Sequence, residues 1–275
     1  MRGLVLGGGG LAGISWMTGL LHGLAETGLD LPGTADHILG TSAGATVAGQ
    51  LSSGLPLAEL HLRQTDPARQ NHEIVPPVET LWPLLETLAA LHAEITDPAE
   101  LRRRIGRLAL DADTVPAADR RAVIAGRLPA HDWPSRPLTL TAVDAETGEP
   151  RTFDRHSGVP LVDAVAASCA IPGIWPTVEI DGHRYMDGGI RTYANADLMT
   201  GQQTVLVVAP MPDPNLDTEL ETLRTTGTVL AITPDEDALA AFGANPLDTT
   251  VRAPAAEAGR AQARRVADQV RKLWL

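Results

Sequence analysis

The first 53 residues repeat one pattern twice: a short apolar strand, a tight turn that contains glycine, and a helix. The segment Gly3–Leu6 is typical of a buried strand and runs directly into a row of glycines, after which apolar residues recur at helical spacing from Ile14 to Ala25. A second strand, predicted over Asp36–Leu39, stops at another glycine-flanked turn and precedes a helix of small residues that reaches about Ser53. Two such units in series predict an α/β fold with a parallel sheet.

The rest of the chain divides into a helical block and a return of strands. Residues 55–130 show helical periodicity and few strand signals, and we interpret them as a cap-like insertion with helices predicted over residues 81–95, 99–110 and 118–128. Beyond this block the pattern predicts strands over 138–143, 151–153, 177–180, 183–186, 203–208 and 228–232, a helix over 161–168, and a C-terminal helix within 250–275. Because the chain contains no internal repeat and no low-complexity linker, residues 1–275 are expected to form a single domain.

Charge and cysteine content exclude several classes of protein. The 22 basic and 34 acidic residues among 275 give a formal net charge of −12. Since binding to nucleic acid requires a basic surface, no nucleic-acid partner is expected. Cys169 is the only cysteine and cannot form an internal disulfide. The chain starts without the features of a secretory signal and has no apolar run of the roughly 20 residues that span a bilayer, which predicts a cytoplasmic protein.

The glycines that follow the first strand are compatible with two functions. Residues 8–13, Gly-Gly-Gly-Leu-Ala-Gly, satisfy the G-x-G-x-x-G pattern with which nucleotide-binding proteins cradle phosphate between a strand and a helix. That function also requires a carboxylate after the second strand to hold a ribose, but this strand closes on Gly40-Thr41-Ser42, and Asp36 lies before it. Nucleotide binding through Gly8–Gly13 is therefore the weaker alternative, and an oxyanion is the competing candidate for the charge that the loop holds.

The turn after the second strand is a candidate nucleophile site. Gly40-Thr41-Ser42-Ala43-Gly44 matches the G-x-S-x-G nucleophile elbow, in which glycines relieve crowding and the serine Oγ is exposed at a helix N-terminus. A structural turn with a capping serine is the alternative. None of the eight histidines lies beyond His183, which disfavours the late histidine of a hydrolase triad, although His156 and His183 remain candidates.

A serine nucleophile needs a base, and Asp187 is the better candidate. Asp187-Gly188-Gly189 forms a short segment in which the glycines allow the backbone to approach a partner closely. An ordinary Asp-Gly turn, such as the one predicted at Asp181-Gly182, is the alternative.

These three motifs, in this order, resemble the patatin-like phospholipase family. The resemblance extends to the connecting segments AVAASCAIPGIWPTVEIDGHRYMDGG and LTAVDAETGEPRTFD, and it covers roughly residues 3–53 and 137–198. It implies a three-layer α/β/α sandwich around a central, mainly parallel sheet. It also implies a serine hydrolase that cleaves acyl esters of lipids with a catalytic dyad.

The resemblance implies a role for each motif residue. Ser42 would be the nucleophile and Asp187 its base, while the N–H groups of the loop would stabilise the oxyanion: Gly8, Gly9 and Gly10. The other motif glycines would support these turns: Gly13, Gly40, Gly44, Gly188 and Gly189. No cofactor is implied, and the spacing of histidines and carboxylates indicates no metal site. The implied partner is a lipid or small ester substrate, with transient contact with a membrane surface, and the oligomeric state is left open.

One position departs from the family pattern. The family usually carries Arg or Lys just before the last glycine of the loop, where this chain has Ala12. Arg191, four residues after Asp187, is a candidate for supplying the missing charge. The departure keeps an alternative function open, namely a catalytically weak or inactive patatin-like module that binds lipid without turnover.

Overall fold

The computed structural model describes residues 1–275, apart from the side chains of Val78, Thr80 and Trp82. Its strands are β1 (Arg2–Leu6), β2 (His37–Gly40), β3 (Leu138–Asp144), β4 (Pro150–Phe153), β5 (Val178–Ile180), β6 (His183–Asp187), β7 (Thr204–Val208) and β8 (Thr228–Ile232). Its α-helices are α1 (Gly10–Glu26), α2 (Leu31–Thr34), α3 (Ala43–Leu51), α4 (Leu57–Thr65), α5 (Val78–Glu94), α6 (Pro98–Asp111), α7 (Ala117–Arg127), α8 (Leu161–Ser168), α9 (Leu216–Arg224), α10 (Glu236–Phe242) and α11 (Arg252–Trp274). Short 3-10 helices are η1 (Gly188–Ile190), η2 (Ala196–Met199) and η3 (Thr249–Val251).

The strands form one sheet in the order β5-β6-β3-β2-β1-β7-β8, and β4 pairs with β3 beside this path. The run β3-β2-β1-β7-β8 is parallel throughout, whereas β4, β5 and β6 pair in antiparallel fashion. Strands β1 and β2 lie side by side, with Leu6 opposite Gly40. Because neighbouring parallel strands end at the same edge of a sheet, the glycine loop after β1 and the serine turn after β2 emerge together.

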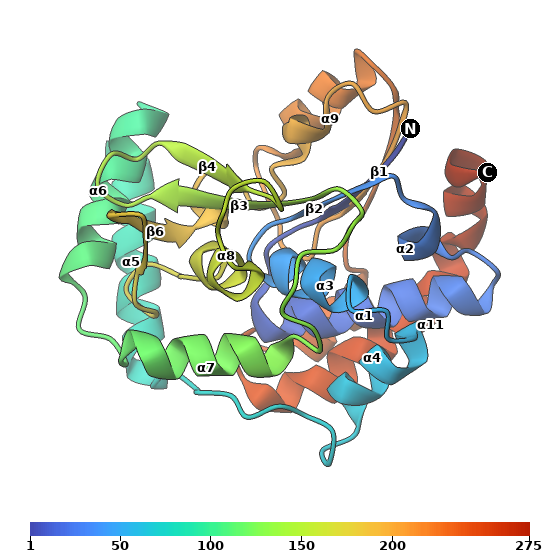
Figure 1. Ribbon diagram of the computed structural model, residues 1–275, viewed down its shortest axis with the longest axis horizontal. Coiled ribbons are helices and arrows are strands. Elements are labelled where there is room, and N and C mark those ends of the chain that lie inside the picture. Colours follow the sequence, from blue (N-terminus) through green and yellow to red (C-terminus); the bar gives the residue numbers. More distant parts are fainter.

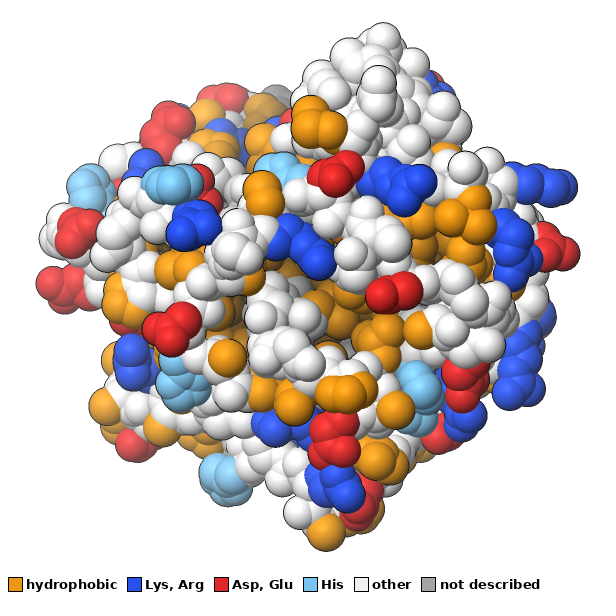
Figure 2. All heavy atoms as spheres, turned by 45° about the vertical axis from the view of Figure 1, so that its right-hand side comes forward, with side chains coloured by type: hydrophobic (Ala, Val, Ile, Leu, Met, Phe, Trp, Pro, Cys, Tyr) orange, Lys and Arg blue, Asp and Glu red, His pale blue; other side chains and the backbone are white. Residues whose placement is uncertain are grey.

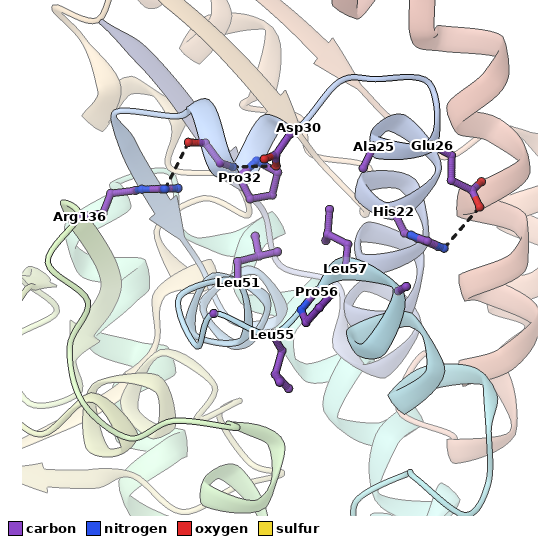
Figure 3. Close-up of a pocket in the computed structure, with 13 residues that line it drawn as sticks. His22, Ala25, Glu26, Asp30, Pro32, Leu51, Leu55, Pro56, Leu57 and Arg136 are labelled. Carbon is purple, nitrogen blue, oxygen red and sulfur yellow. Dashed lines mark hydrogen bonds and ion pairs between the residues drawn. The ribbon is translucent and has the colours of Figure 1, made fainter.

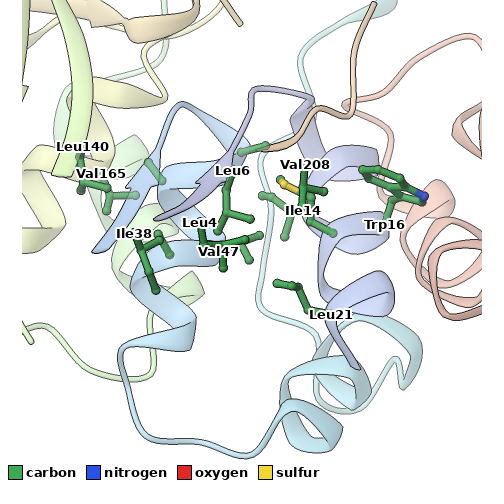
Figure 4. Packing of buried hydrophobic residues seen from close by; sticks show 14 of the residues in the cluster. Leu4, Leu6, Ile14, Trp16, Leu21, Ile38, Val47, Leu140, Val165 and Val208 are labelled. Atoms are coloured by element: carbon green, nitrogen blue, oxygen red, sulfur yellow. The ribbon is translucent and has the colours of Figure 1, made fainter. Parts of the chain in front are cut away.

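Helices cover both faces of this sheet, with α9 on one face and α1, α3 and α11 on the other (Figure 1). Side chains alternate along β1: Leu4 and Leu6 belong to the larger core cluster, and Val5 belongs to the cluster on the opposite face. On the larger face, strand and helix side chains interdigitate (Figure 4): Leu4, Leu6, Ile38, Leu140 and Val208 from the sheet, and Ile14, Trp16, Leu21, Val47 and Val165 from the helices. The predicted α/β/α sandwich with a mainly parallel sheet is confirmed.

In the described backbone, the block 55–130 contains helices joined by loops and no strand. The three helices predicted there correspond to α5, α6 and α7, and the block also contains the unpredicted α4. Two further helices, α9 and α10, were not predicted either, because each is short and carries only a few apolar residues at helical spacing.

Charged side chains of both signs cover the surface shown in Figure 2, with apolar side chains between them. This mixing means that the net charge of −12 does not gather into one acidic field on the face shown. None of the described helices combines the length and the apolar composition that crossing a bilayer requires.

Helices α1 and α11 cross at close range through glycines. A Cβ built on Gly19 would lie 1.9 Å from the carbonyl oxygen of Ala256, and one built on Gly259 would lie 2.2 Å from the carbonyl oxygen of Trp16. The indole of Trp16 donates across the same interface to Gln262 Oε1 at 2.9 Å. The two helix backbones therefore contact each other directly, which fixes the C-terminal helix against the core.

We expect Gly19→Ala to lower the free energy of unfolding by roughly 3 kcal/mol, because the added methyl group must push α1 and α11 apart. The matched control is Gly126→Ala in α7, where the new Cβ would meet nothing nearer than Asn71 Cβ at 3.9 Å. This control should be neutral or stabilise by up to about 1 kcal/mol, since alanine favours the helix. Urea unfolding measures both, and equal losses in the two variants would contradict the close crossing.

Candidate active site

Ser42 lies in the turn between β2 and α3, directly before the first residue of the helix. Its backbone is held at φ 54° and ψ −114°, a region that residues other than glycine rarely adopt. Two hydrogen bonds fix this turn: Ser42 N–H donates to Ser168 Oγ at 2.9 Å, and the Ser42 carbonyl accepts from Cys169 Sγ at 3.1 Å. The strained turn presents the hydroxyl to a cleft while the residue as a whole stays buried.

Asp187 ends β6 and contacts Ser42, although 145 residues separate the two in sequence. Ser42 Oγ donates to Asp187 Oδ2 at 2.7 Å, and Asp187 Oδ1 accepts from the N–H of Gly189 at 2.7 Å. Burial raises the pKa of Asp187 to about 6, against the lowering effect of these two hydrogen bonds and of the Arg120 charge. At neutral pH the group is therefore a carboxylate of raised basicity within direct reach of the serine proton.

The glycine loop between β1 and α1 lines the same cleft as the Ser42 hydroxyl. Gly10 requires the absence of a side chain, since its φ is +62° and a Cβ would lie 2.8 Å from the carbonyl oxygen of Pro246. The N–H groups of Gly9 and Gly10 lie at the first turn of α1, where no carbonyl of the helix can accept from them. The N–H of Gly8 instead donates to the Tyr193 carbonyl at 2.8 Å. Of the three expected oxyanion donors, Gly8 therefore already has a carbonyl partner for its N–H in this structure.

The remaining motif glycines lie in the turns that hold these groups. Gly44 donates its N–H to the Gly7 carbonyl at 3.0 Å, which ties the serine turn to the glycine loop. The others stand at the ends or starts of elements: Gly40 at the end of β2, Gly13 in the first turn of α1, and Gly188 and Gly189 in η1 directly after Asp187.

Asn195 joins the serine turn to the aspartate loop and was not singled out in the sequence. Its buried side-chain Nδ2 donates to Thr41 Oγ1 at 3.1 Å and to the Gly188 carbonyl at 3.2 Å. The Asn195 side-chain amide thus binds both Thr41, the residue before Ser42, and Gly188, the residue after Asp187. An asparagine with φ 53° is a recognisable turn residue, but this local signal does not reveal which distant groups its side chain binds.

Ser42 and Asp187 lie in a cleft of about 450 Å³. Its walls are mostly apolar and include Leu81, Leu84, Leu85 and Leu88 of α5, Leu239 and Phe242 of α10, and Pro210, Met211, Pro212, Pro246 and Leu247 of the loops. An apolar cleft with a few convergent polar groups is the usual form of a small-molecule site.

The charge expected from Arg191 is not available to this cleft. Arg191 Nη1 donates to Asp197 Oδ1 and to Asn195 Oδ1, each at 2.9 Å. Its positive charge is therefore neutralised by Asp197, and the structure gives no support to Arg191 as a replacement for a basic residue at position 12. Ala12 itself is fully buried in the core.

A second, more open hollow of about 650 Å³ lies between α1, α2 and α4 and shares no lining residue with the cleft (Figure 3). Its charged groups already have partners: Asp30 accepts from Gly33 N–H at 2.9 Å, and Glu26 pairs with Arg260 at 2.6 Å. This hollow therefore offers no reactive pair like the one in the cleft. Within the described part of the chain, no three His, Cys, Asp or Glu side chains are placed to bind a metal ion together.

Comparison with known families shows where the chain belongs. The model of the patatin-like phospholipase family matches residues 4–199, a region that includes the glycine loop, Ser42 and Asp187. The chain therefore belongs to the patatin-like phospholipase family, a family of lipid hydrolases.

Individual relatives are more distant. Uncharacterized NTE family proteins of Mycobacterium tuberculosis and Mycobacterium bovis are each 29% identical over 187 residues, which are 68% of this chain and 42% of each relative. The chain thus spans less than half the length of these relatives. VipD from Legionella pneumophila is 14% identical with a TM-score of 0.47, over 98% of this chain and 67% of VipD. ExoU in the ExoU–SpcU complex of Pseudomonas aeruginosa is 19% identical with a TM-score of 0.42, over 100% of this chain and 52% of that chain.

We expect Ser42→Gly to be more stable than Ser42→Ala by about 1 kcal/mol or more, because glycine adopts the Ser42 conformation without strain. Ala45, inside α3, provides a control of opposite sign, since Ala45→Gly should destabilise the helix. Thermal unfolding compares the variants. A Ser42→Gly variant that melts at or below Ser42→Ala would show that the turn stores no strain.

Proposed function

We propose that the chain is a serine acyl hydrolase that cleaves carboxylic esters of lipids through a Ser42–Asp187 dyad. The observation that carries this proposal is the 2.7 Å hydrogen bond from Ser42 Oγ to Asp187 Oδ2 in a mostly apolar cleft. Membership of the patatin-like phospholipase family supports it. Nucleophile and base are in direct contact, so the proposed mechanism uses no histidine.

The proposed reaction begins with the transfer of the Ser42 proton to Asp187 while Oγ attacks the ester carbonyl. The tetrahedral intermediate carries its negative charge on the former carbonyl oxygen, where the N–H groups of Gly9 and Gly10 and the positive end of the α1 dipole would stabilise it. Gly8 contributes by fixing the loop to Tyr193. Asp187 then returns the proton to the leaving alcohol, and an ester between the acyl group and Ser42 remains.

Deacylation repeats the same steps with water as the nucleophile. Asp187 takes a proton from a water molecule that attacks the acyl-Ser42 carbonyl, and the proton returns to Ser42 Oγ as the acid is released. The raised pKa of Asp187 suits this double role, because a base of pKa about 6 accepts and releases protons near neutral pH.

The walls of the cleft support an acyl chain as the bound group. Leucines of α5 and α10 surround the space above the dyad, whereas a nucleotide would need groups that bind phosphate and ribose. Three apolar residues that line the cleft are also exposed at the surface: Leu85, Tyr193 and Leu239. These residues support transient contact with a membrane surface, from which a lipid substrate would enter.

We also propose that residues 1–275 act as one catalytic domain, with 55–130 as a cap over the site. Strands β7 and β8 lie beyond the region matched by the family model, yet they continue the same sheet from β1. Helix α5, within 55–130, supplies one wall of the cleft. Both observations support a single unit in which the helical block shapes substrate access.

Removing the nucleophile or its base should abolish turnover without unfolding the chain. We expect Ser42→Ala to lower kcat/KM for p-nitrophenyl esters by at least about 10³-fold and to abolish fluorophosphonate labelling. Asp187→Asn should lower kcat/KM by about 10²–10⁴-fold. Asp181→Asn, at an exposed turn of the same hairpin, is the matched control and should retain full activity. Labelling or turnover that persists in Ser42→Ala would reject the dyad, and a wild-type chain that binds lipid without turnover would favour the binding module.

The pH dependence tests the state of Asp187. The base must be ionised, so kcat/KM should fall about tenfold per pH unit below a midpoint near 6, the raised pKa of the buried carboxyl. The folded pKa lies above the usual 3.8, so ionisation costs folding free energy above pH 6 and costs nothing below about pH 4. Asp187→Asn, which is neutral at every pH, should therefore be more stable than the wild type at pH 8, on the order of 1–3 kcal/mol. An activity midpoint near 4 would contradict the burial of the charge.

A further inference from the structure

Arg120 on α7 is a buried cation for which the structure shows an unpaired nitrogen. The residue is 6% exposed, and its guanidinium lies over the ring of Trp175, 3.9 Å from the ring centroid. Its Nη1 is buried and has no hydrogen-bond partner among the described residues. Burial of a charge without a full set of partners destabilises the folded state, so the position of Arg120 calls for an explanation in the surrounding groups.

Two other arginines of α7 show how an arginine charge is ordinarily accommodated in a folded protein. Arg127 is buried as well, but it forms a two-pronged ion pair with Glu73 at 2.7 and 2.9 Å. Arg121 is half-exposed and pairs with Asp163 at the surface. Arg120 has neither arrangement, because it is buried away from water and forms no ion pair with a carboxylate among the described residues.

A small cavity places Arg120 beside the nucleophile. The cavity has a volume of about 20 Å³, enough for one water-sized oxygen. Arg120, Cys169 and Trp175 line it together with Ser42 and Gly10, which also line the substrate cleft. Arg120 of α7 and Ser42 therefore border the same small space.

Asp187 is the acid in this region that lacks a cation in direct contact. Besides burial and the hydrogen bonds from Ser42 and Gly189, the charge of Arg120 acts on the carboxyl and lowers its pKa. Arg120 is itself a cation at neutral pH, although burial lowers its pKa to about 9.

The other titratable groups near this pair carry no competing net charge. Arg127 and Glu73 neutralise each other in their ion pair. Burial raises the pKa of the Cys169 thiol and of the Tyr193 hydroxyl, so both remain neutral at pH 7. Among the described side chains, Arg120 is therefore the cation whose charge acts on Asp187.

We propose that Arg120 is a positioning residue of the Ser42–Asp187 site: its unpaired, buried charge keeps the Asp187 carboxylate ionised and favours the negative charge that develops at Ser42. The cation thus comes from the helical block 55–130 rather than from the glycine loop, where position 12 is alanine, or from Arg191, which Asp197 neutralises. This inference rests on the proposed function.

The test measures kcat/KM for p-nitrophenyl butyrate and the rate of fluorophosphonate labelling between pH 5 and 9. Arg120→Gln and Arg120→Met remove the charge, Arg120→Lys keeps it, and Arg121→Gln is the matched control on the same helix. In both neutral variants, the midpoint pH below which kcat/KM falls should rise by about one unit. A shift of this order is expected when one nearby charge is lost at an effective dielectric constant of about 20. Rates should then be about fivefold lower at pH 6 and about tenfold lower at pH 5, and they should approach the wild-type rates above pH 8. Arg120→Lys and Arg121→Gln should keep the wild-type midpoint.

Several outcomes would overturn the role of Arg120. One is a wild-type midpoint of the pH profile in the neutral variants. The other is a loss of rate that is equal at every pH, which is expected of a purely structural residue. Thermal melting is measured first, because removing an unpaired charge should leave the fold intact. Unfolding of both neutral variants would therefore also count against the proposal. Wild type and Ser42→Ala run in the same series: if the wild type shows no turnover that depends on Ser42, the proposed function fails, whereas a normal wild type with an unshifted Arg120→Gln rejects Arg120 alone.

Discussion

The contact between Ser42 and Asp187 depends on the pairing of strand β3. Ser42 follows β2, which is parallel to β3, and Asp187 ends β6, which is antiparallel to β3. Along β3, Leu140 lies opposite Gly40, and two residues later Ala142 lies opposite Asp187. One strand therefore sets the register of both neighbours and brings the two motifs to the same place. A slip of β3 by one residue would move the aspartate away from the hydroxyl and turn its side chain to the other face.

Unfavourable features gather around this contact. Ser42 has a strained backbone, Asp187 is a buried carboxylate with a raised pKa, and Arg120 is a buried cation with an unpaired nitrogen. Each costs on the order of 1–3 kcal/mol when taken alone. In β1 and β7, by contrast, apolar side chains alternate regularly between the two core clusters. Such energetically unfavourable features gather beside the Ser42 hydroxyl, whereas the rest of the fold follows the usual packing rules. This combination is typical of a functional site, where reactivity takes precedence over stability.

The parts of the fold that could be predicted from the sequence are those with local signals. Strand periodicity, glycine turns and the long helices predicted an α/β fold with a parallel sheet, because each signal lies within a few residues of the element it specifies. The three-layer sandwich was implied by the resemblance to the patatin-like family. The burial of Arg120 could not be recognised in this way, although Arg120, Val123, Ile124 and Arg127 share one face of α7 by their spacing. A run of arginines on a helix is ordinarily a solvated face, and only the packing of α7 against α3 and α8 shows that Arg120 and Arg127 are buried. The partner of the Gly8 N–H is likewise a carbonyl from a distant loop, which no pattern around Gly8 indicates.

Position 12 has a packing role in this chain that explains the absence of a charged side chain there. The N–H of Ala12 donates to the Pro246 carbonyl at 3.0 Å, and the same carbonyl would lie 2.8 Å from a Cβ on Gly10. The loop around Pro246 and helix α10 lie beyond the region matched by the family model, yet they form a wall of the cleft. The C-terminal part of the chain thus packs directly on the glycine loop and occupies the space beside it. The adjoining residue Leu247 also lines the small cavity in which Arg120 of α7 meets Ser42, so the C-terminal part of the chain and α7 enclose this side of the serine turn together.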